Sequence, residues 1–126
     1  MILDAYAAFL TAAGLTYFTN NGFSVKIGKA TIDVAVSRSG MVTISAYVGL
    51  VNFMGPAKRL CSELIQQYPE YRIWPEKYND YYEIEVERVF PYTTIPDLHK
   101  LVVDMAEMVE EGYAIGKTVV GEEFCR

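Results

Sequence analysis

The feature that most constrains this fold is a stretch in which apolar and less apolar side chains alternate along the chain. Ile32, Val34 and Val36 alternate with their neighbours, and the alternation resumes over residues 42–50. Successive side chains of a strand point to opposite faces of a sheet, so this period of two predicts two strands that each bury one face. The turn at residues 37–40 is too short for a crossover helix, which indicates that the strands are antiparallel.

Turn residues place another strand before this pair. The dipeptide Asn21-Gly22 predicts a hairpin, because both central residues of a type I′ turn need positive φ. Residues 16–20 precede it as a strand, and the segment that follows it has one apolar face. That face consists of Phe23, Val25 and Ile27. We therefore expect a three-stranded antiparallel meander in this part of the chain.

A second hairpin is predicted farther along the chain. Residues 72–74 form a short strand that ends at Pro75, and residues 76–80 form a polar loop. Alternation over residues 81–90 then predicts a longer strand with one apolar face. Because the connection is short, the two strands are expected to pair antiparallel.

Three segments show apolar residues at the spacing of a helix. They are residues 2–13, which Gly14 ends, residues 56–68, and a segment that Thr94 caps and Gly112 ends. The stripe predicted to be buried on the second helix is Ala57, Leu60, Cys61, Leu64, Ile65 and Tyr68. The stripe predicted for the third is Ile95, Leu98, Leu101, Val102, Met105, Met108 and Val109.

The predicted order of elements is helix, three strands, helix, two strands, helix. Because each helix and each main strand has one apolar face, the simplest arrangement is an antiparallel sheet with helices packed on it, the α+β class. A chain of 126 residues with 52% apolar residues can bury a core of its own. We therefore predict a single α+β domain over residues 1–126.

Composition limits the class of function. The net charge is −5, and the Lys and Arg residues are scattered, which disfavours a nucleic-acid partner. No segment has the roughly 18 consecutive apolar residues of a membrane span, and the N-terminal residues lack the basic segment of a secretory signal. Cys61 and Cys125 are too few for a disulfide framework, and Cys61 falls among core positions. We expect a cytoplasmic protein that binds neither membrane nor nucleic acid.

The stretch EEGYAIGKTVV contains residue types of a phosphate-binding loop, with Gly112, Gly116, Lys117 and Thr118. That loop has the pattern G-x-x-x-x-G-K-[ST], follows a buried strand, and wraps the phosphates with its backbone N–H groups. Here the spacing between the glycines is one residue shorter, and a predicted helix precedes them. The stretch is therefore interpreted as a helix end followed by a turn.

Two further sets of residues were candidates for chemistry. His99 is the only histidine and could act as a general base, but its position on the polar side of the third helix predicts a solvated side chain. Glu83, Glu85 and Glu87 share one face of a strand, where carboxylates could hold a hard cation or act as an acid and a base. A solvated outer face, opposite Lys26, Arg38 or Arg72 of neighbouring strands, is the simpler interpretation. We predict no catalytic, metal-binding or cofactor-binding residue, and no enzyme.

A surface low in charge is the strongest candidate for binding. One face of the strand at residues 41–51 has no charged side chain, and aromatic residues concentrate between residues 68 and 92. Aromatic side chains with a polar tip are enriched at protein interfaces. We predict that another subunit or a peptide covers this face. The residues assigned to it are Met41, Thr43, Tyr47, Val51, Tyr81 and Val89.

The outline of the chain resembles the type III secretion chaperone-like fold, and within it the YbjN family of bacterial proteins, described as candidate sensory transduction regulators. The resemblance rests on AAGLTYF, where a helix ends and runs into a strand, and on VTISAYVGLV followed by PAKRLCSELIQQY. It spans nearly the whole chain except the tail GKTVVGEEFCR. It implies a homodimeric protein-binding domain with no catalytic motif, whose partner segments lie across apolar patches or add to a sheet edge.

The rival hypothesis is a small-molecule-binding domain or a modest enzyme. Its pocket would lie between the helices and the sheet, be largely apolar, and contain a few convergent polar groups. Tyr47, Tyr82, Glu85 and His99 are the residues that could supply those groups.

Overall fold

The structure, a computed structural model, describes residues 16–19, 22–94 and 97–121. The helix predicted over residues 2–13, its end at Gly14, and Ile95 and Cys125 lie outside the described residues. The strands are β1 (Thr16–Thr19), β2 (Gly22–Ile27), β3 (Ala30–Val36), β4 (Met41–Val51), β5 (Arg72–Lys77) and β6 (Tyr82–Pro91). The helices are α2 (Met54–Gln67), the short 3-10 helix η1 (Tyr92–Thr94), and α3 (Leu98–Val120).

All described strands form one antiparallel sheet in the order β1-β2-β3-β4-β6-β5. The α+β class is confirmed, as is the order of a meander, a helix, a hairpin and a closing helix. The meander before α2 has four described strands, β1 to β4, instead of the three expected, because the segments on both sides of the predicted Asn21-Gly22 turn are separate, paired strands.

The predicted turn at Asn21-Gly22 is wrong in register. Thr19 pairs with Gly22, which makes Gly22 the first residue of β2. Gly22 does not have the positive φ that the turn would need. Glycine is required there because a Cβ would lie 1.8 Å from the Val34 carbonyl oxygen on β3.

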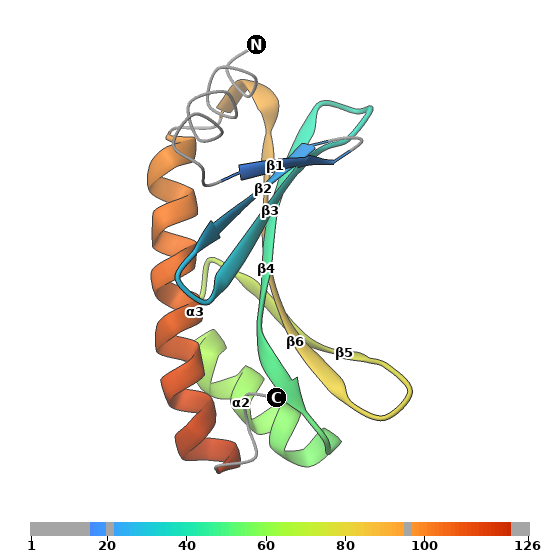
Figure 1. The fold of residues 1–126 in the computed structure, drawn as a ribbon, viewed down its shortest axis with the longest axis vertical. Coiled ribbons are helices and arrows are strands. Elements are labelled where there is room, and N and C mark those ends of the chain that lie inside the picture. The colour runs from blue at the N-terminus through green and yellow to red at the C-terminus, as the bar shows by residue number, and fades with distance from the viewer. Residues whose placement is uncertain (1–15, 20–21, 95–96, 122–126) are drawn as a thin grey trace.

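The helices cover one face of the sheet, here called the inner face (Figure 1). α3 packs across β2, β3 and β4, whereas α2 packs against β5, β6 and α3. The alternating apolar residues of the strands point into this layer as the sequence predicts. The largest fully buried side chains are Ile32, Ile44, Leu60, Leu64, Ile84, Met105 and Met108.

Helix α2 confirms most of its predicted stripe, with Ala57, Leu60, Cys61 and Leu64 buried. Ile65 is the exception, because its side chain is 43% exposed. It follows Leu64 by about 100° around the helix, which turns it past the edge of the sheet. Tyr68 caps the helix end, and its hydroxyl donates a hydrogen bond to the Glu111 carboxylate of α3.

Helix α3 begins and ends later than predicted. Asp97 is the N-cap and accepts a hydrogen bond from the Lys100 backbone N–H at 3.0 Å, whereas Thr94 lies in η1 and bonds the Pro91 carbonyl. The helix continues through Gly112 and Gly116 to Val120. Gly112 is a packing residue, because a Cβ there would lie 3.0 Å from Val48 Cγ1.

The stretch EEGYAIGKTVV is therefore the last part of α3 and not a helix end with a turn. Its residues lie inside a continuous helix, so they do not form a loop that could wrap phosphates. The rest of the tail, residues 122–126, lies outside the described residues.

Strand β5 continues through Pro75 to Lys77, against the predicted stop. β5 is an edge strand of the described sheet. A proline is tolerated there because the missing N–H removes no ladder hydrogen bond on the open side.

Candidate functional site: the outer face of the sheet

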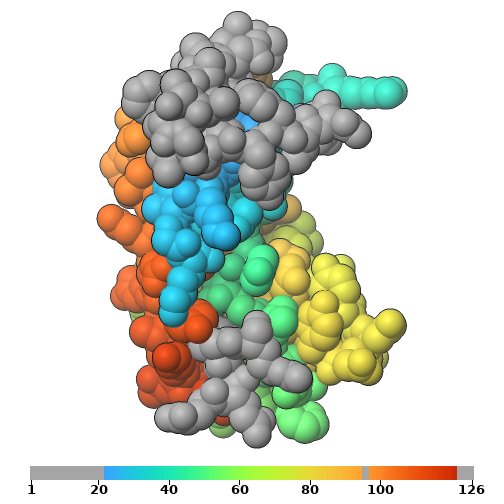
Figure 2. All heavy atoms as spheres, in the orientation of Figure 1, coloured from blue at the N-terminus to red at the C-terminus, as the bar shows by residue number. Residues whose placement is uncertain are grey.

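The face of the sheet away from α2 and α3, here called the outer face, is concave. The ends of the sheet bend away from α3 (Figure 1), and the space-filling view shows a hollow between the turn after β3 and the β5–β6 hairpin (Figure 2). In the described sheet, this face exposes every second residue of β3, β4, β5 and β6. The binding residues predicted from the sequence were expected on this face.

The middle of the outer face carries an uncharged strip. Thr43 of β4 stands in register with Ala35 of β3 on one side and with Val89 of β6 on the other. Tyr47 and Val89 are the most exposed of these side chains, at 49% and 47%. We define the uncharged strip as Ala35, Met41, Thr43, Ser45, Tyr47 and Val89.

A β-bulge in β4 removes Val51 from this face. The register shifts between Tyr47 and Leu50, so that Leu50 pairs with Glu83 on the outer face and Val51 with Tyr82 on the inner face. One extra residue in a strand turns every following side chain of that strand to the opposite face. Val51 is therefore buried, with 2% of its surface exposed, and its assignment to the outer face is wrong.

Tyr81 lies at the tip of the β5–β6 hairpin, outside both strands. Its ring stacks on that of Tyr78, with centroids 5.2 Å apart, and the Tyr78 N–H bonds the Tyr81 carbonyl at 2.9 Å. The predicted binding residues thus divide into four on the uncharged strip, one at the hairpin tip and one in the core.

Beside the uncharged strip, the β5–β6 side of the outer face is acidic. Glu85 stands between Tyr47 and Trp74 in the strand register, and Glu83 stands between Leu50 and Glu76. Partial burial and the neighbouring Glu83, Glu76 and Asp33 carboxylates raise the pKa of Glu85 to about 8. We define the acidic half as Trp74, Glu76, Glu83, Glu85 and Glu87.

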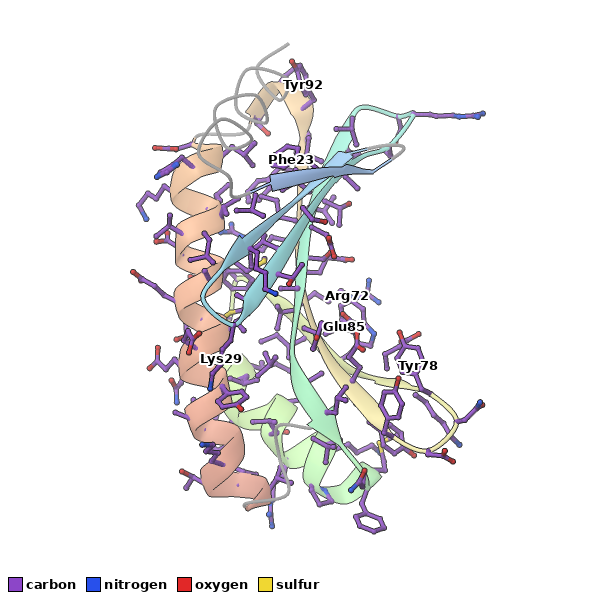
Figure 3. The ribbon with its side chains drawn as sticks, in the orientation of Figure 1. Phe23, Lys29, Arg72, Tyr78, Glu85 and Tyr92 are labelled. Carbon is purple, nitrogen blue, oxygen red and sulfur yellow. The ribbon has the colours of Figure 1, made fainter. Side chains whose placement is uncertain are left out.

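One basic side chain of the protein already lies on the acidic half. The Arg72 guanidinium is 4.6 Å from the centroid of the Trp74 ring, and its Nη1 is 3.5 Å from Glu87 Oε1. The Trp74 indole N–H donates to Glu76 Oε2 at 2.9 Å. Figure 3 shows Arg72 and Glu85 on the side of the sheet away from α3, with Tyr78 near the hairpin tip. Arg72 and Trp74 are two residues apart on β5 and therefore share this face. From the sequence, Arg72 was only a possible neighbour of the acidic stripe, and Trp74 was not among the predicted binding residues.

The rival set of pocket residues is not brought together. Tyr47 and Glu85 face each other across β4 and β6, but Tyr82 packs against the core on the inner face. His99 is exposed on α3, as its position predicted, and α3 lies on the inner side of the sheet. These four side chains do not share a pocket.

The geometry disfavours two other kinds of site. Cys61 is buried in the core, as predicted, and burial raises the pKa of its thiol to about 11, which disfavours the nucleophilic thiolate. Among residues 16–19, 22–94 and 97–121, no three His, Cys, Asp or Glu side chains converge closely enough to hold a metal ion.

A second concavity lies on the other side of the molecule, between the β2–β3 turn and α3. It has a volume of about 560 Å³ and is mostly apolar, with Ile27, Val103 and Ala106 in its lining. Glu110 lies at the same place and accepts a hydrogen bond from the Lys29 N–H at 3.1 Å. No pattern in the sequence predicts this cavity, because its walls come from segments far apart in the chain.

The comparisons with known proteins reach the level of the fold. No protein-family model matches the chain, and a comparison with curated proteins finds no match. Among solved structures, the chain is similar to YbjN from E. coli, described as a "putative transcription regulator", with a TM-score of 0.56 and 11% sequence identity. The match covers 95% of this chain and 89% of that one. The resemblance to YbjN is therefore confirmed as a likeness of fold.

Neither α2 nor α3 combines the length and the hydropathy needed to cross a bilayer.

Proposed function

We propose that this protein is a non-enzymatic, protein-binding domain that uses the outer face of its sheet. The observation that carries the proposal is the concave outer face, whose central strand β4 has no charged residue and exposes Tyr47. Uncharged, partly aromatic surfaces with a polar surround are typical of protein interfaces. The fold likeness to YbjN, described as a "putative transcription regulator", is consistent with a non-enzymatic binding domain.

A second copy of the chain is the proposed occupant of the uncharged strip. Tyr47 and Val89 are about half exposed, and the residues between them are small or uncharged. Two such strips meeting in an isologous interface would remove this apolar surface from water without burying a charge. The homodimer and a cytoplasmic location remain the expectations from the sequence.

Photo-crosslinking tests the proposal. A photoreactive amino acid at position 47 should form covalent adducts with a second copy of the chain, or with another protein of a lysate. The same group at position 65 is the control, because Ile65 is also exposed but lies on α2. Equal adducts from both positions, or none from position 47, would contradict the proposal.

The apolar cavity beside α3 favours a second candidate function, the binding of a small apolar molecule. Its volume of about 560 Å³ lies within the range of ligand sites, roughly 300–1,000 Å³. A thermal-shift screen with apolar metabolites and divalent metals tests it. A ligand that raises the melting temperature of the wild type but not of Val103→Trp would support it, because Val103 is only partly buried and the indole would occupy part of the cavity.

A further inference from the structure

The acidic half has a charge that the uncharged strip does not share. The carboxylates on the described outer face are Asp33, Glu76, Glu83, Glu85 and Glu87, whereas its basic side chains are Lys26 and Arg72. Arg72 contacts Glu87, but no Lys or Arg stands in register with Glu83 or Glu85. The negative potential reaches the hairpin tip, where Glu83 is the main cause of a raised pKa at Tyr78. Glu85 is mostly protonated at neutral pH, but the other four carboxylates still outnumber the two basic side chains, so the surface has an excess of negative charge that its own strands do not neutralise.

We propose that the acidic half docks a basic, extended segment of a partner protein, whose Lys or Arg side chains lie between the carboxylates and the Trp74 ring. This proposal rests on the proposed function and specifies the chemistry of the partner. Arg72 shows the mode of contact within the protein, since its guanidinium lies over Trp74 and beside Glu87. Cations are attracted to the face of an indole ring, and paired carboxylates add to that attraction.

The spacing of the carboxylates fits an extended segment. Glu83, Glu85 and Glu87 follow each other at every second residue of β6, a repeat of about 6.6 Å along the strand. A partner segment with basic side chains at alternate positions has the same repeat. The turn after β3 and the β5–β6 hairpin project beyond the middle of the outer face, so a segment along β6 would lie between them (Figure 1).

Charge selects this occupant over a second copy of the chain. A second copy placed on the acidic half would bring Glu83 and Glu85 against like charges, which is unfavourable when water is excluded. Addition of a strand at the β5 edge is also disfavoured, because Pro75 offers no N–H to an incoming strand. The face itself remains as the docking surface.

Trp74 provides a built-in reporter, because it is the only tryptophan of the chain. The probe is a fluorescein-labelled peptide of alternating lysine and serine, and an alternating glutamate and serine peptide is the charge-reversed control. We expect the lysine peptide to bind in fluorescence anisotropy and an unlabelled version of it to change the Trp74 emission. The glutamate peptide should do neither.

Matched variants separate the effect of the acidic half on peptide binding from the effect of the net charge of the protein. Glu83→Gln/Glu85→Gln should raise the dissociation constant of the lysine peptide at least about tenfold, which corresponds to the loss of roughly one charge-assisted contact. Glu63→Gln/Glu70→Gln removes two carboxylates from exposed positions on and just after α2, and should weaken binding of the lysine peptide less than about twofold. Both double variants are compared at about pH 9, where Glu85 is ionised as well.

Three results would overturn the proposal: no binding of the lysine peptide at low salt, equal losses in the two double variants, or binding that leaves the Trp74 emission unchanged. If any of them occurs while the position-47 crosslinks still form, the basic partner is wrong but the protein-binding function stands. If both the crosslinks and the peptide binding are absent, the proposed function is wrong as well.

Discussion

At the scale of single residues, Glu85 makes the stability of the protein depend on pH. Its pKa is raised to about 8 in the folded chain by partial burial and by Glu83, Glu76 and Asp33, against about 4.5 as a free side chain. Between these values the folded state holds a proton that the unfolded state has lost, so stability falls as pH rises from about 5 to 8. Water screens this partly exposed carboxyl, so we expect a loss of about 1 kcal/mol, or about 4 °C in melting temperature. Thermal unfolding at several pH values measures it.

Glu85→Gln is the matched variant for that effect. The amide keeps the shape of the protonated carboxyl but does not titrate, so the fall in melting temperature between pH 5 and 8 should become shallower by about the same 4 °C. Glu63→Gln should leave the profile unchanged, because Glu63 is exposed on α2. An unaltered slope in Glu85→Gln would show that other groups set the pH dependence.

Gly112 is the second residue whose role can be measured. A Cβ at this position would lie 3.0 Å from Val48 and 3.3 Å from Leu64, so larger side chains force α3 away from β4 and α2. We expect Gly112→Val to destabilise the fold by about 2 kcal/mol in urea unfolding. Gly55→Val is the control, because Gly55 is also helical and no atom lies within 4 Å of its Cβ position. Equal losses would mean that helix propensity alone is responsible.

At the scale of elements, the bulge in β4 decides which side chains reach the outer face. Val51 and Val89 were both predicted to be exposed, yet the bulge places Val51 in the core and leaves Val89 about half exposed. Val51→Glu should therefore cost about 3 kcal/mol or more, because it buries a charge, whereas Val89→Glu should change stability by about 0.5 kcal/mol or less. Chemical denaturation at low protein concentration measures both. A loss in Val89→Glu as large as that in Val51→Glu would contradict the register.

The elements themselves were predictable where a period runs unbroken. The alternation within β3, the alternation over residues 42–48 of β4 and the helical stripe of α2 each reflect one buried face, and burial is what the pattern records. Interruptions carry no such local signal. Pro75 and Gly112 are chain breakers by propensity, but an open sheet edge tolerates the first and a close helix contact requires the second.

At the scale of the whole molecule, the fold class followed from the sequence and the candidate site followed only in part. The exposure of Tyr47 and Val89 was predicted because each lies an even number of residues from the other outward-facing side chains of its strand. Arg72 was predicted as a possible neighbour of the acidic stripe, but the uncharged strip and the acidic half form one surface because β6 lies between β4 and β5, an order that no short sequence pattern states. Sheet order depends on the packing of α2 against β5 and β6, which no local window contains.

The two proposed partners of the outer face should respond to salt in opposite directions. In a homodimer over the uncharged strip, the two acidic halves lie at the borders of the interface and repel each other, and salt screens that repulsion. A basic segment is attracted by the same carboxylates, and salt screens that attraction. Raising NaCl from about 50 to 500 mM should lower the dimer dissociation constant about threefold and raise that of the lysine peptide at least about tenfold. Sedimentation equilibrium and anisotropy measure the two constants on the same preparation. A dimer that weakens with salt would mean that ion pairs hold it, and that the uncharged strip is not its interface.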